Sequence, residues 1–247
     1  MKNLILLLLL LSMHITLFAH TSIKKLGFES GISIYGKVGF IDIILEEDDE
    51  KQTYRMEVTA SSTGLVKALT NNRRDTFVSE GYIKNGVYFP IKFTRETSKT
   101  DYKRLTTYIF DYKKKTVIKN RVVTEVQRQS HLNIVNMEII NTKKTKIIES
   151  YIRNIKLYAN DFLSLYLNMQ NGNLKKGKIN YIDMSPKDTL LLIEKNKIEV
   201  QKHNGKEKYN IEIFYDTNSI FFKKLISEDI AFYGDAYIKK VYEKVSL

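Results

Sequence analysis

Few residues of this sequence are placed to do chemistry. The chain has no cysteine, and it lacks the Gly-x-Ser-x-Gly elbow that exposes a nucleophilic serine. His20, His131 and His203 are far apart along the chain, and none has the spacing of a zinc-binding pair. No spacing selects a Ser-His-Asp set or a phosphate-cradling glycine loop. The sequence therefore predicts no catalytic residue, no metal site and no cofactor.

A run of five acidic residues, Glu46 to Glu50, offers carboxylate oxygens of the kind that bind calcium. The run lacks the alternating ligands and the central glycine of an EF-hand loop. We interpret Glu46 to Lys51 as a solvated turn between two strands.

Aromatic and basic residues provide the binding chemistry. Aromatic side chains of a curved sheet line a cavity for an acyl chain or sugar, or else they fill the core. Arginines at a cavity mouth hold phosphate or carboxylate groups, or else they are solvated loop charges. The candidate ligand-binding residues are Arg73, Arg74, Tyr88, Phe93, Arg95, Tyr108, Phe110 and Tyr166.

The formal net charge of +12 favours anionic partners such as lipid head groups or acidic polysaccharide. No nucleic-acid-binding motif is present, and the basic residues are scattered lysines rather than an arginine patch. We therefore expect an anionic envelope component, and no nucleic acid, as the partner.

These side chains must be positioned by strands. From Tyr54 to Ala60 apolar residues occupy every second position, which predicts a strand with one dry face, typical of antiparallel sheets. Asn85-Gly86 predicts a two-residue type I′ hairpin turn. Pro90 cannot donate to a ladder, so its strand is expected at a sheet edge or to be bulged there.

The other expected strands follow the same reasoning. Residues 20 to 30 are expected to be a lead-in, and 231 to 245 an edge or barrel-closing strand. A second Asn-Gly hairpin is expected at His203 to Lys206. Further extended segments are expected at 32–45, 65–69, 77–83, 87–94, 105–112, 116–128, 132–140, 145–155, 178–184, 190–193, 197–202, 209–215 and 219–226.

One helix is expected, at about residues 159 to 171. Asn160 or Asp161 would cap it, Phe162, Leu165, Tyr166 and Met169 would share a face, and Gly172 would end it. So apolar a helix should cover the open end or concave face of the sheet, or act as a lid over a cavity. The fold class is therefore mostly β: a curved antiparallel sheet or barrel-like meander with one mid-chain helix.

The amino terminus has the features of a secretory signal peptide. Lys2 precedes the unbroken apolar run Leu4 to Leu11, and Ala19 suits a cleavage site. The run is short for a membrane span, which needs about 20 residues. We expect residues 1–19 to be removed and residues 20–247 to form a single exported β-rich domain in the periplasm.

Several short motifs resemble a widespread, largely uncharacterised family of exported bacterial proteins that is described as a domain of unknown function. The resemblance lies in Tyr35 to Gly39, Ala60 to Leu65, Ser79 to Gly81 before Pro90, Tyr108 to Tyr112 and the helix Asp161 to Tyr166. It implies a periplasmic curved sheet or barrel, loosely similar in shape to carriers that shuttle lipoproteins between membranes. It implies no catalytic residue.

These features predict a non-enzymatic periplasmic protein that binds a hydrophobic or amphipathic envelope molecule, such as a lipid or glycolipid. An assembly or structural factor that binds another envelope protein through an exposed strand edge is the alternative. A hydrolase of envelope polysaccharide is a third possibility, and it would need two converging carboxylates.

Overall fold

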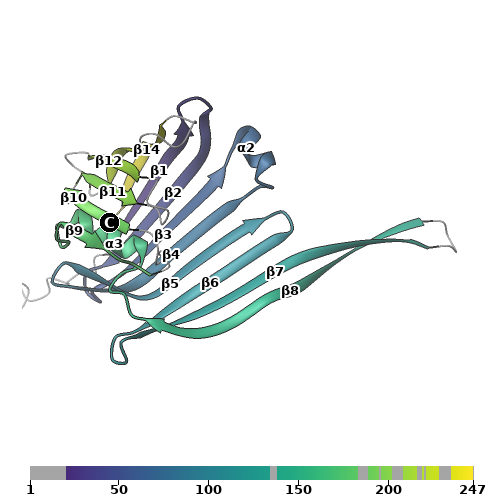
Figure 1. Ribbon diagram of the computed structural model, residues 1–247, viewed down its shortest axis with the longest axis horizontal. Helices are drawn as coiled ribbons and strands as arrows, with labels where there is room; N and C mark the ends of the chain where they lie inside the picture. The colour runs from purple at the N-terminus through teal and green to yellow at the C-terminus, as the bar shows by residue number, and fades with distance from the viewer. Residues whose placement is uncertain are drawn as a thin grey trace, which may run out of the picture.

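The computed structural model describes residues 21–133, 138–182, 189–194, 196–201, 208–215, 219, 221–227 and 235–246. One antiparallel sheet of fourteen strands runs through this part of the chain, and two helices accompany it (Figure 1). The strands are β1 (Thr21–Ile32), β2 (Gly36–Asp48), β3 (Thr53–Ser62), β4 (Arg74–Lys84), β5 (Val87–Lys99), β6 (Tyr102–Asp111), β7 (Thr116–Asn133), β8 (Glu138–Lys156), β9 (Gly177–Ile179), β10 (Thr189–Glu194), β11 (Lys197–Gln201), β12 (Lys208–Tyr215), β13 (Phe222–Ser227) and β14 (Ala236–Ser246). The helices are α2 (Gly64–Leu69) and α3 (Phe162–Gln170).

The sheet is strongly curved and open. The strand order is β8-β7-β6-β5-β4-β3-β2-β1-β14-β13-β12-β11-β10-β9, so β8 and β9 are its two edges. Strands β9 to β12 fold over toward the concave face, where α3 lies (Figure 1). The predicted fold class, a mostly β protein with a curved antiparallel sheet, is confirmed, and the sheet is not a closed barrel.

The hairpin turn at Asn85-Gly86 and the bulge at Pro90 are both present, as predicted. Asn85 and Gly86 take φ values of 53° and 74°, the positive φ values that a type I′ hairpin needs at both central positions. At Pro90 strand β5 is bulged, because Gly81 pairs with Pro90 while Glu80 pairs with Lys92. Gly81 allows this bulge, since a Cβ there would lie 2.0 Å from the carbonyl oxygen of Phe89.

Two expectations near the amino terminus are wrong. The expected lead-in, residues 20 to 30, is replaced by β1, an interior strand that pairs with β2 and β14 from residue 21 onward. The expected strand 32–45 is a turn at residues 33–35 followed by β2. Gly27, Gly31 and the lysines at 24 and 25 interrupt the alternation of apolar and polar residues in the segment 21–32. The segment therefore lacks the sequence signal of a strand.

The apolar run Leu65 to Leu69 is the helix α2 rather than an extended segment, so the structure has two helices where one was expected. Leu65 and Leu69 are 75% and 74% exposed. An apolar run this short does not distinguish a strand from a helix.

Two further expectations near the carboxyl half are also wrong. Residues 116–128, 132–140 and 145–155 are not three strands but the two long strands β7 and β8, whose hairpin projects from the body of the sheet (Figure 1). Residues 141–144, which separate the expected segments 132–140 and 145–155, lie within β8 because they pair with residues 127 to 130 of β7. The last strand, β14, is neither an edge nor a barrel closure, since β1 and β13 flank it.

Some expectations lie outside the described residues. They are the leader at residues 1–19, the hairpin His203 to Lys206, and parts of the expected strands, including residues 183–184, 202, 220 and 231–234.

The core lies between the concave face of the sheet and α3. Buried side chains come from β1 to β7 on one side and from α3 on the other, with contributions from the strands that fold over. Leu26, Leu45, Met56, Tyr108 and Leu167 are each at most 1% exposed. Helix α3 therefore covers part of the concave face, as the sequence predicted.

Candidate functional site

Helix α3 organises the concave face because polar side chains fix both of its ends to the sheet. At its start Asp161 caps the helix, accepting bonds from the backbone N–H groups of Leu163 and Ser164 at 2.8 and 3.0 Å. The other carboxylate oxygen of Asp161 accepts a bond from the Ser79 hydroxyl of β4 at 2.7 Å, and Ser79 contacts the Tyr54 hydroxyl of β3 at 2.9 Å.

Asp161 is fully buried, and burial raises the pKa of its carboxyl group to about 6. Its hydrogen bonds oppose this rise because they stabilise the charged form. Burial also raises the pKa of the Tyr54 phenol well above its usual range. The arrangement is a buried cap that fixes the helix to two strands.

At the other end of α3, Asn168 bonds to the backbone of strand β5. Its side-chain oxygen accepts from the Tyr88 N–H at 2.8 Å, and its amide nitrogen donates to the Tyr88 carbonyl at 2.9 Å. The same nitrogen donates to the Asn160 side chain at 2.8 Å. Gln170, two residues further along α3, donates to the Tyr215 hydroxyl of β12 at 3.0 Å.

An aromatic pocket of about 170 Å³ lies between the sheet and the start of α3. Its wall is formed by Phe77, Phe93, Arg95, Phe162, Tyr181 and Ile182. The Phe162 ring packs edge-on against Phe77 and Phe93, with centroid distances of 5.0 and 5.7 Å. Because the guanidinium of Arg95 lies 5.6 Å from the Phe77 ring centroid, a positive charge borders a hollow that is walled by aromatic rings.

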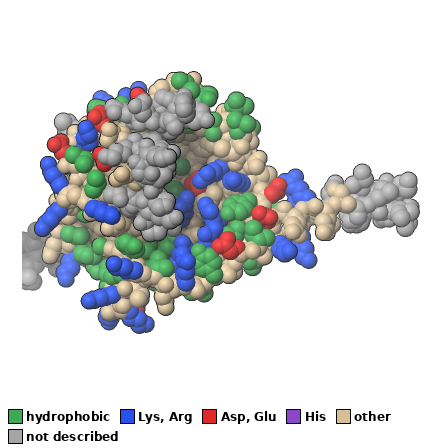
Figure 2. Space-filling model, viewed as in Figure 1, with side chains coloured by type: hydrophobic (Ala, Val, Ile, Leu, Met, Phe, Trp, Pro, Cys, Tyr) green, Lys and Arg blue, Asp and Glu red, His purple; other side chains and the backbone are tan. Residues whose placement is uncertain are grey.

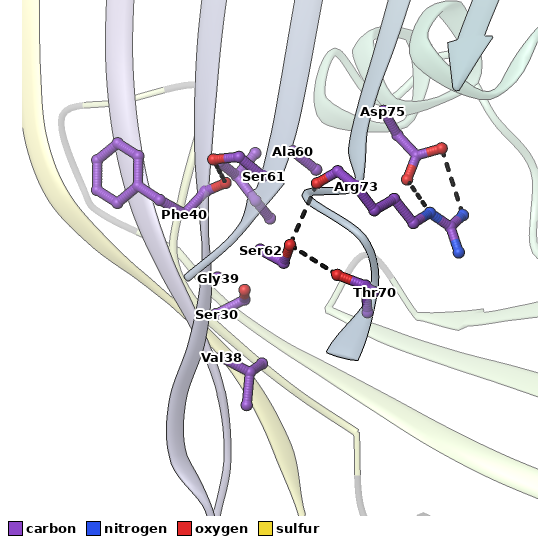
Figure 3. A pocket seen from close by; sticks show the side chains of 11 residues that line it. Ser30, Val38, Gly39, Phe40, Ala60, Ser61, Ser62, Thr70, Arg73 and Asp75 are labelled. Atoms are coloured by element: carbon purple, nitrogen blue, oxygen red, sulfur yellow. Dashed lines mark hydrogen bonds and ion pairs between the residues drawn. The ribbon is translucent and has the colours of Figure 1, made fainter. Parts of the chain in front are cut away.

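A second cavity, of about 190 Å³, lies near the end of the sheet that carries α2 (Figure 3). Ser62 donates to the Arg73 carbonyl and contacts the Thr70 hydroxyl at 2.9 Å. Arg73 pairs with Asp75 at 2.6 Å, and this pairing helps hold the pKa of the Asp75 carboxyl below its usual value against the opposing effect of burial. The polar groups of this cavity are thus engaged with one another.

A larger hollow, of about 480 Å³, lies between the turn after β5 and strand β7. Its lining is mostly polar, and Arg128 pairs there with Asp101 at 2.8 Å. It contains few apolar side chains that could hold a lipid.

The structure brings two of the sequence-predicted site residues, Phe93 and Arg95, together in the aromatic pocket. Tyr108 pairs with Phe93 on the neighbouring strand β6, and its ring stacks on the Phe93 ring at a centroid distance of 5.8 Å. The others are elsewhere: Tyr88 and Phe110 are buried in the core, Tyr166 packs on Phe221 and Phe222, Arg73 lines the second cavity, and Arg74 is exposed.

Sequence reasoning missed Phe77, Phe162, Tyr181 and Ile182 as pocket residues and Asn168 as an anchor. Phe77 and Phe162 were placed in the expected strand and helix, but the contact between them joins positions 85 residues apart. An asparagine inside an apolar helix is the one available signal for Asn168, because a buried amide needs hydrogen-bond partners.

Among the described residues, no cluster of three or more histidine, aspartate or glutamate side chains is arranged to hold a metal ion. No helix within the described ranges is long and apolar enough to cross a membrane.

The fold and site define a class: an open, curved antiparallel sheet that holds a helix and an aromatic pocket on its concave face. Residues 28–139, a little under half of the chain, match a family model described as a protein of unknown function (DUF3108). The predicted resemblance to an uncharacterised family is therefore confirmed over these residues, which include strands β2 to β7 and the second part of β1, from residue 28 to residue 32. The comparison with curated proteins found no match.

Proposed function

We propose that this protein is a non-enzymatic, exported, periplasmic protein that binds an amphipathic anionic molecule of the cell envelope, a lipid or glycolipid. The observation that carries the proposal is the aromatic pocket with Arg95 in its wall. Phenylalanine rings solvate an apolar chain, and a guanidinium pairs with a carboxylate or phosphate.

The pocket's size limits what it holds. Ligand sites that enclose a whole drug-sized molecule measure about 300–1,000 Å³, whereas this pocket measures about 170 Å³. We therefore propose that it takes the part of the ligand where the apolar chain meets the charged group, while the remainder lies along the concave face.

Replacing Arg95 by methionine tests the charge requirement at nearly constant side-chain length. Wild-type protein should bind a fluorescent long-chain fatty acid about tenfold more tightly than its uncharged methyl ester, because one charge-assisted hydrogen bond contributes about 1.5–3 kcal/mol. In Arg95→Met the preference for the acid should disappear while ester binding stays. Fluorescence titration of both probes measures this.

Arg74→Met is the matched control, since Arg74 is exposed on the neighbouring strand β4 and lines none of the three cavities. It should bind both probes as the wild type does. Equal binding of acid and ester by the wild type, or no binding of either, would reject the proposal. Native mass spectrometry of protein purified from its own envelope fraction, followed by solvent extraction, would then give the mass class of the natural ligand.

One observation favours the alternative, an assembly factor that binds another envelope protein. The edge strand β8 is 19 residues long and exposes the apolar side chains Ile147 and Ile152, at 62% and 71%. A long exposed edge with apolar side chains is a template for pairing with a strand of another chain.

A double substitution, Ile147→Lys and Ile152→Lys, tests this alternative. If β8 binds a partner strand, the two charges should abolish stoichiometric co-purification of that partner and leave fatty-acid binding intact. Retention of the partner by this variant would place the contact elsewhere. Ile109→Lys, a substitution of a 39% exposed isoleucine in the interior strand β6, is the control that should retain the partner.

A further inference from the structure

Four basic side chains lie on the concave face of strands β5, β7 and β8, and one of them also lines the aromatic pocket. We call Arg95, Lys119, Arg121 and Arg153 the basic cluster. Lys119 pairs across the ladder with Tyr108 and with Arg153, while Arg121 pairs with Thr106 and with Tyr151. Paired residues share a face, and Tyr108 is buried on the face that carries Phe93. The cluster therefore lies on the concave face, and Figure 2 shows basic side chains gathered over the strands beside α3.

The sheet geometry sets the spacing of the cluster. Directly opposed side chains have Cβ atoms about 5 Å apart, so Lys119 and Arg153 are neighbours. Arg95 and Arg121 both oppose Thr106, which places them two strands apart, or about 10 Å. Lys119, Arg121 and Arg153, on the adjacent strands β7 and β8, can therefore approach one multiply charged anion, and Arg95 lies at the side of this group that borders the aromatic pocket.

Aromatic rings hold these cations in place. Lys119 Nζ lies 5.1 Å from the Tyr108 ring centroid, and the guanidinium groups of Arg121 and Arg153 lie 6.0 and 5.4 Å from that of Tyr151. Cations over ring faces are favourably placed, and less side-chain entropy remains to be lost when a ligand binds.

The charges of the cluster do not balance. Lys119 directly opposes Arg153, and like charges opposed in a ladder destabilise a sheet. Lys119 is also only 8% exposed, so water screens its charge little. Glu149 pairs with Arg121 at 3.1 Å, is 41% exposed and supplies one negative charge, while the Asp75 carboxylate interacts electrostatically with Arg95. A fold that holds such an arrangement is stabilised by any anion that binds there.

We propose that the basic cluster is a binding site for a phosphate group, and that the envelope molecule bound by this protein carries a phosphorylated head group. Arginine guanidinium groups bind phosphate oxygens bidentately, and lysine binds them as a point charge. The choice of lipid as the source of the phosphate rests on the proposed function, because Arg95 belongs both to the cluster and to the aromatic pocket.

The test uses three probes with the full exported protein: dioctanoyl phosphatidic acid, dioctanoylglycerol and inorganic phosphate. Isothermal titration calorimetry should show that phosphatidic acid binds at least tenfold more tightly than dioctanoylglycerol, which has the same chains without phosphate. In Arg121→Gln/Arg153→Gln most of that tenfold difference should be lost. Arg128→Gln/Lys146→Gln removes two exposed charges from the same two strands and should bind as the wild type does.

Thermal unfolding separates binding from folding. Without ligand, the Arg121→Gln/Arg153→Gln variant should melt at the wild-type temperature or above it, because one of two opposed like charges is gone. A cluster that serves only stability would instead melt lower in this variant, with unchanged probe binding.

The outcomes distinguish this inference from the proposed function. Unchanged binding of phosphatidic acid by Arg121→Gln/Arg153→Gln would overturn the phosphate site, while the fatty-acid result would still decide the pocket. If inorganic phosphate binds as tightly as phosphatidic acid and the wild type does not bind fatty acid, the phosphate site holds with free phosphate as its ligand, and the lipid proposal fails. Equal binding of phosphatidic acid and dioctanoylglycerol by the wild type overturns the inference.

Discussion

Asn168→Ala should lower the free energy of unfolding by about 2–4 kcal/mol, because it leaves two buried backbone groups without partners. Asn168 is 2% exposed, and it bonds to both the N–H and the carbonyl of Tyr88. Chemical denaturation followed by circular dichroism would measure the change.

The physical reason lies in the register of strand β5. Its pairing with β6 begins only at Lys92, so Tyr88 has a neighbouring strand on one side alone, at Ile83 of β4. The Asn168 amide makes the hydrogen bonds that a second neighbouring strand would make. The Tyr112 hydroxyl likewise donates to the Pro90 carbonyl at 2.8 Å. An apolar side chain at position 168 cannot offer these bonds.

Asn171→Ala is the matched control for this substitution. Asn171 lies at the same end of α3, is exposed, and donates to the Gly86 carbonyl at 3.3 Å. Its loss should cost less than about 1 kcal/mol, since water replaces the bond. A similar small cost for Asn168→Ala would show that Tyr88 does not depend on the helix.

Comparison of the wild type with Asp161→Asn should show that Asp161 contributes more to the free energy of unfolding as the pH falls. Between pH 7.5 and 4.5 the wild type should gain about 2 kcal/mol in free energy of unfolding relative to the asparagine variant. The comparison requires urea denaturation of both proteins at several pH values within this range.

The sign follows from the direction of the pKa shift. The pKa of Asp161 is about 6 in the folded protein, above the ordinary value of 3.8 for an aspartate carboxyl group. The folded state therefore binds a proton that the unfolded state releases, and the burial penalty of the charged carboxylate is fully present above pH 6. Acidification through this window removes the penalty, so the contribution of Asp161 to stability rises as the pH falls. A constant difference between the two proteins would contradict a buried, titrating Asp161.

Asp75→Asn provides a control with the opposite sign. The pKa of Asp75 is lowered in the folded protein, where hydrogen bonds from Arg73 and Thr97 outweigh burial. Its stabilising contribution is present above the unfolded pKa and is lost as the pH falls. Relative to the Asp75→Asn variant, the wild type should therefore lose stability in acid.

Much of the local structure could be predicted because its causes lie within a few residues. Asn85 and Gly86 form the turn because both adopt positive φ readily. Asp161 caps α3 through N–H groups two and three residues away. The bulge at Pro90 follows from the missing N–H of proline. Residues 65–69 show the limit, since a short apolar run fits a strand and a helix equally well.

The candidate site could be predicted only in part. Phe93 was identified as an aromatic residue of the curved sheet and Arg95 as an arginine that could border a cavity. The reasoning from aromatic content also selected Tyr88 and Phe110, which fill the core. Composition does not tell a pocket wall from a core contact. That difference depends on where α3 packs, and thus on Phe162 reaching Phe77.

By itself, the sequence determined many of the strands, the mid-chain helix with its cap, and the antiparallel character of the sheet. Only the tertiary structure decided that β1 pairs with β14, that the sheet stays open, and that Lys119 opposes Arg153. Hydrophobic alternation fixes which face of a strand is buried, whereas the choice of neighbour and register depends on side chains from distant parts of the chain packing together. The basic cluster exists only through that register.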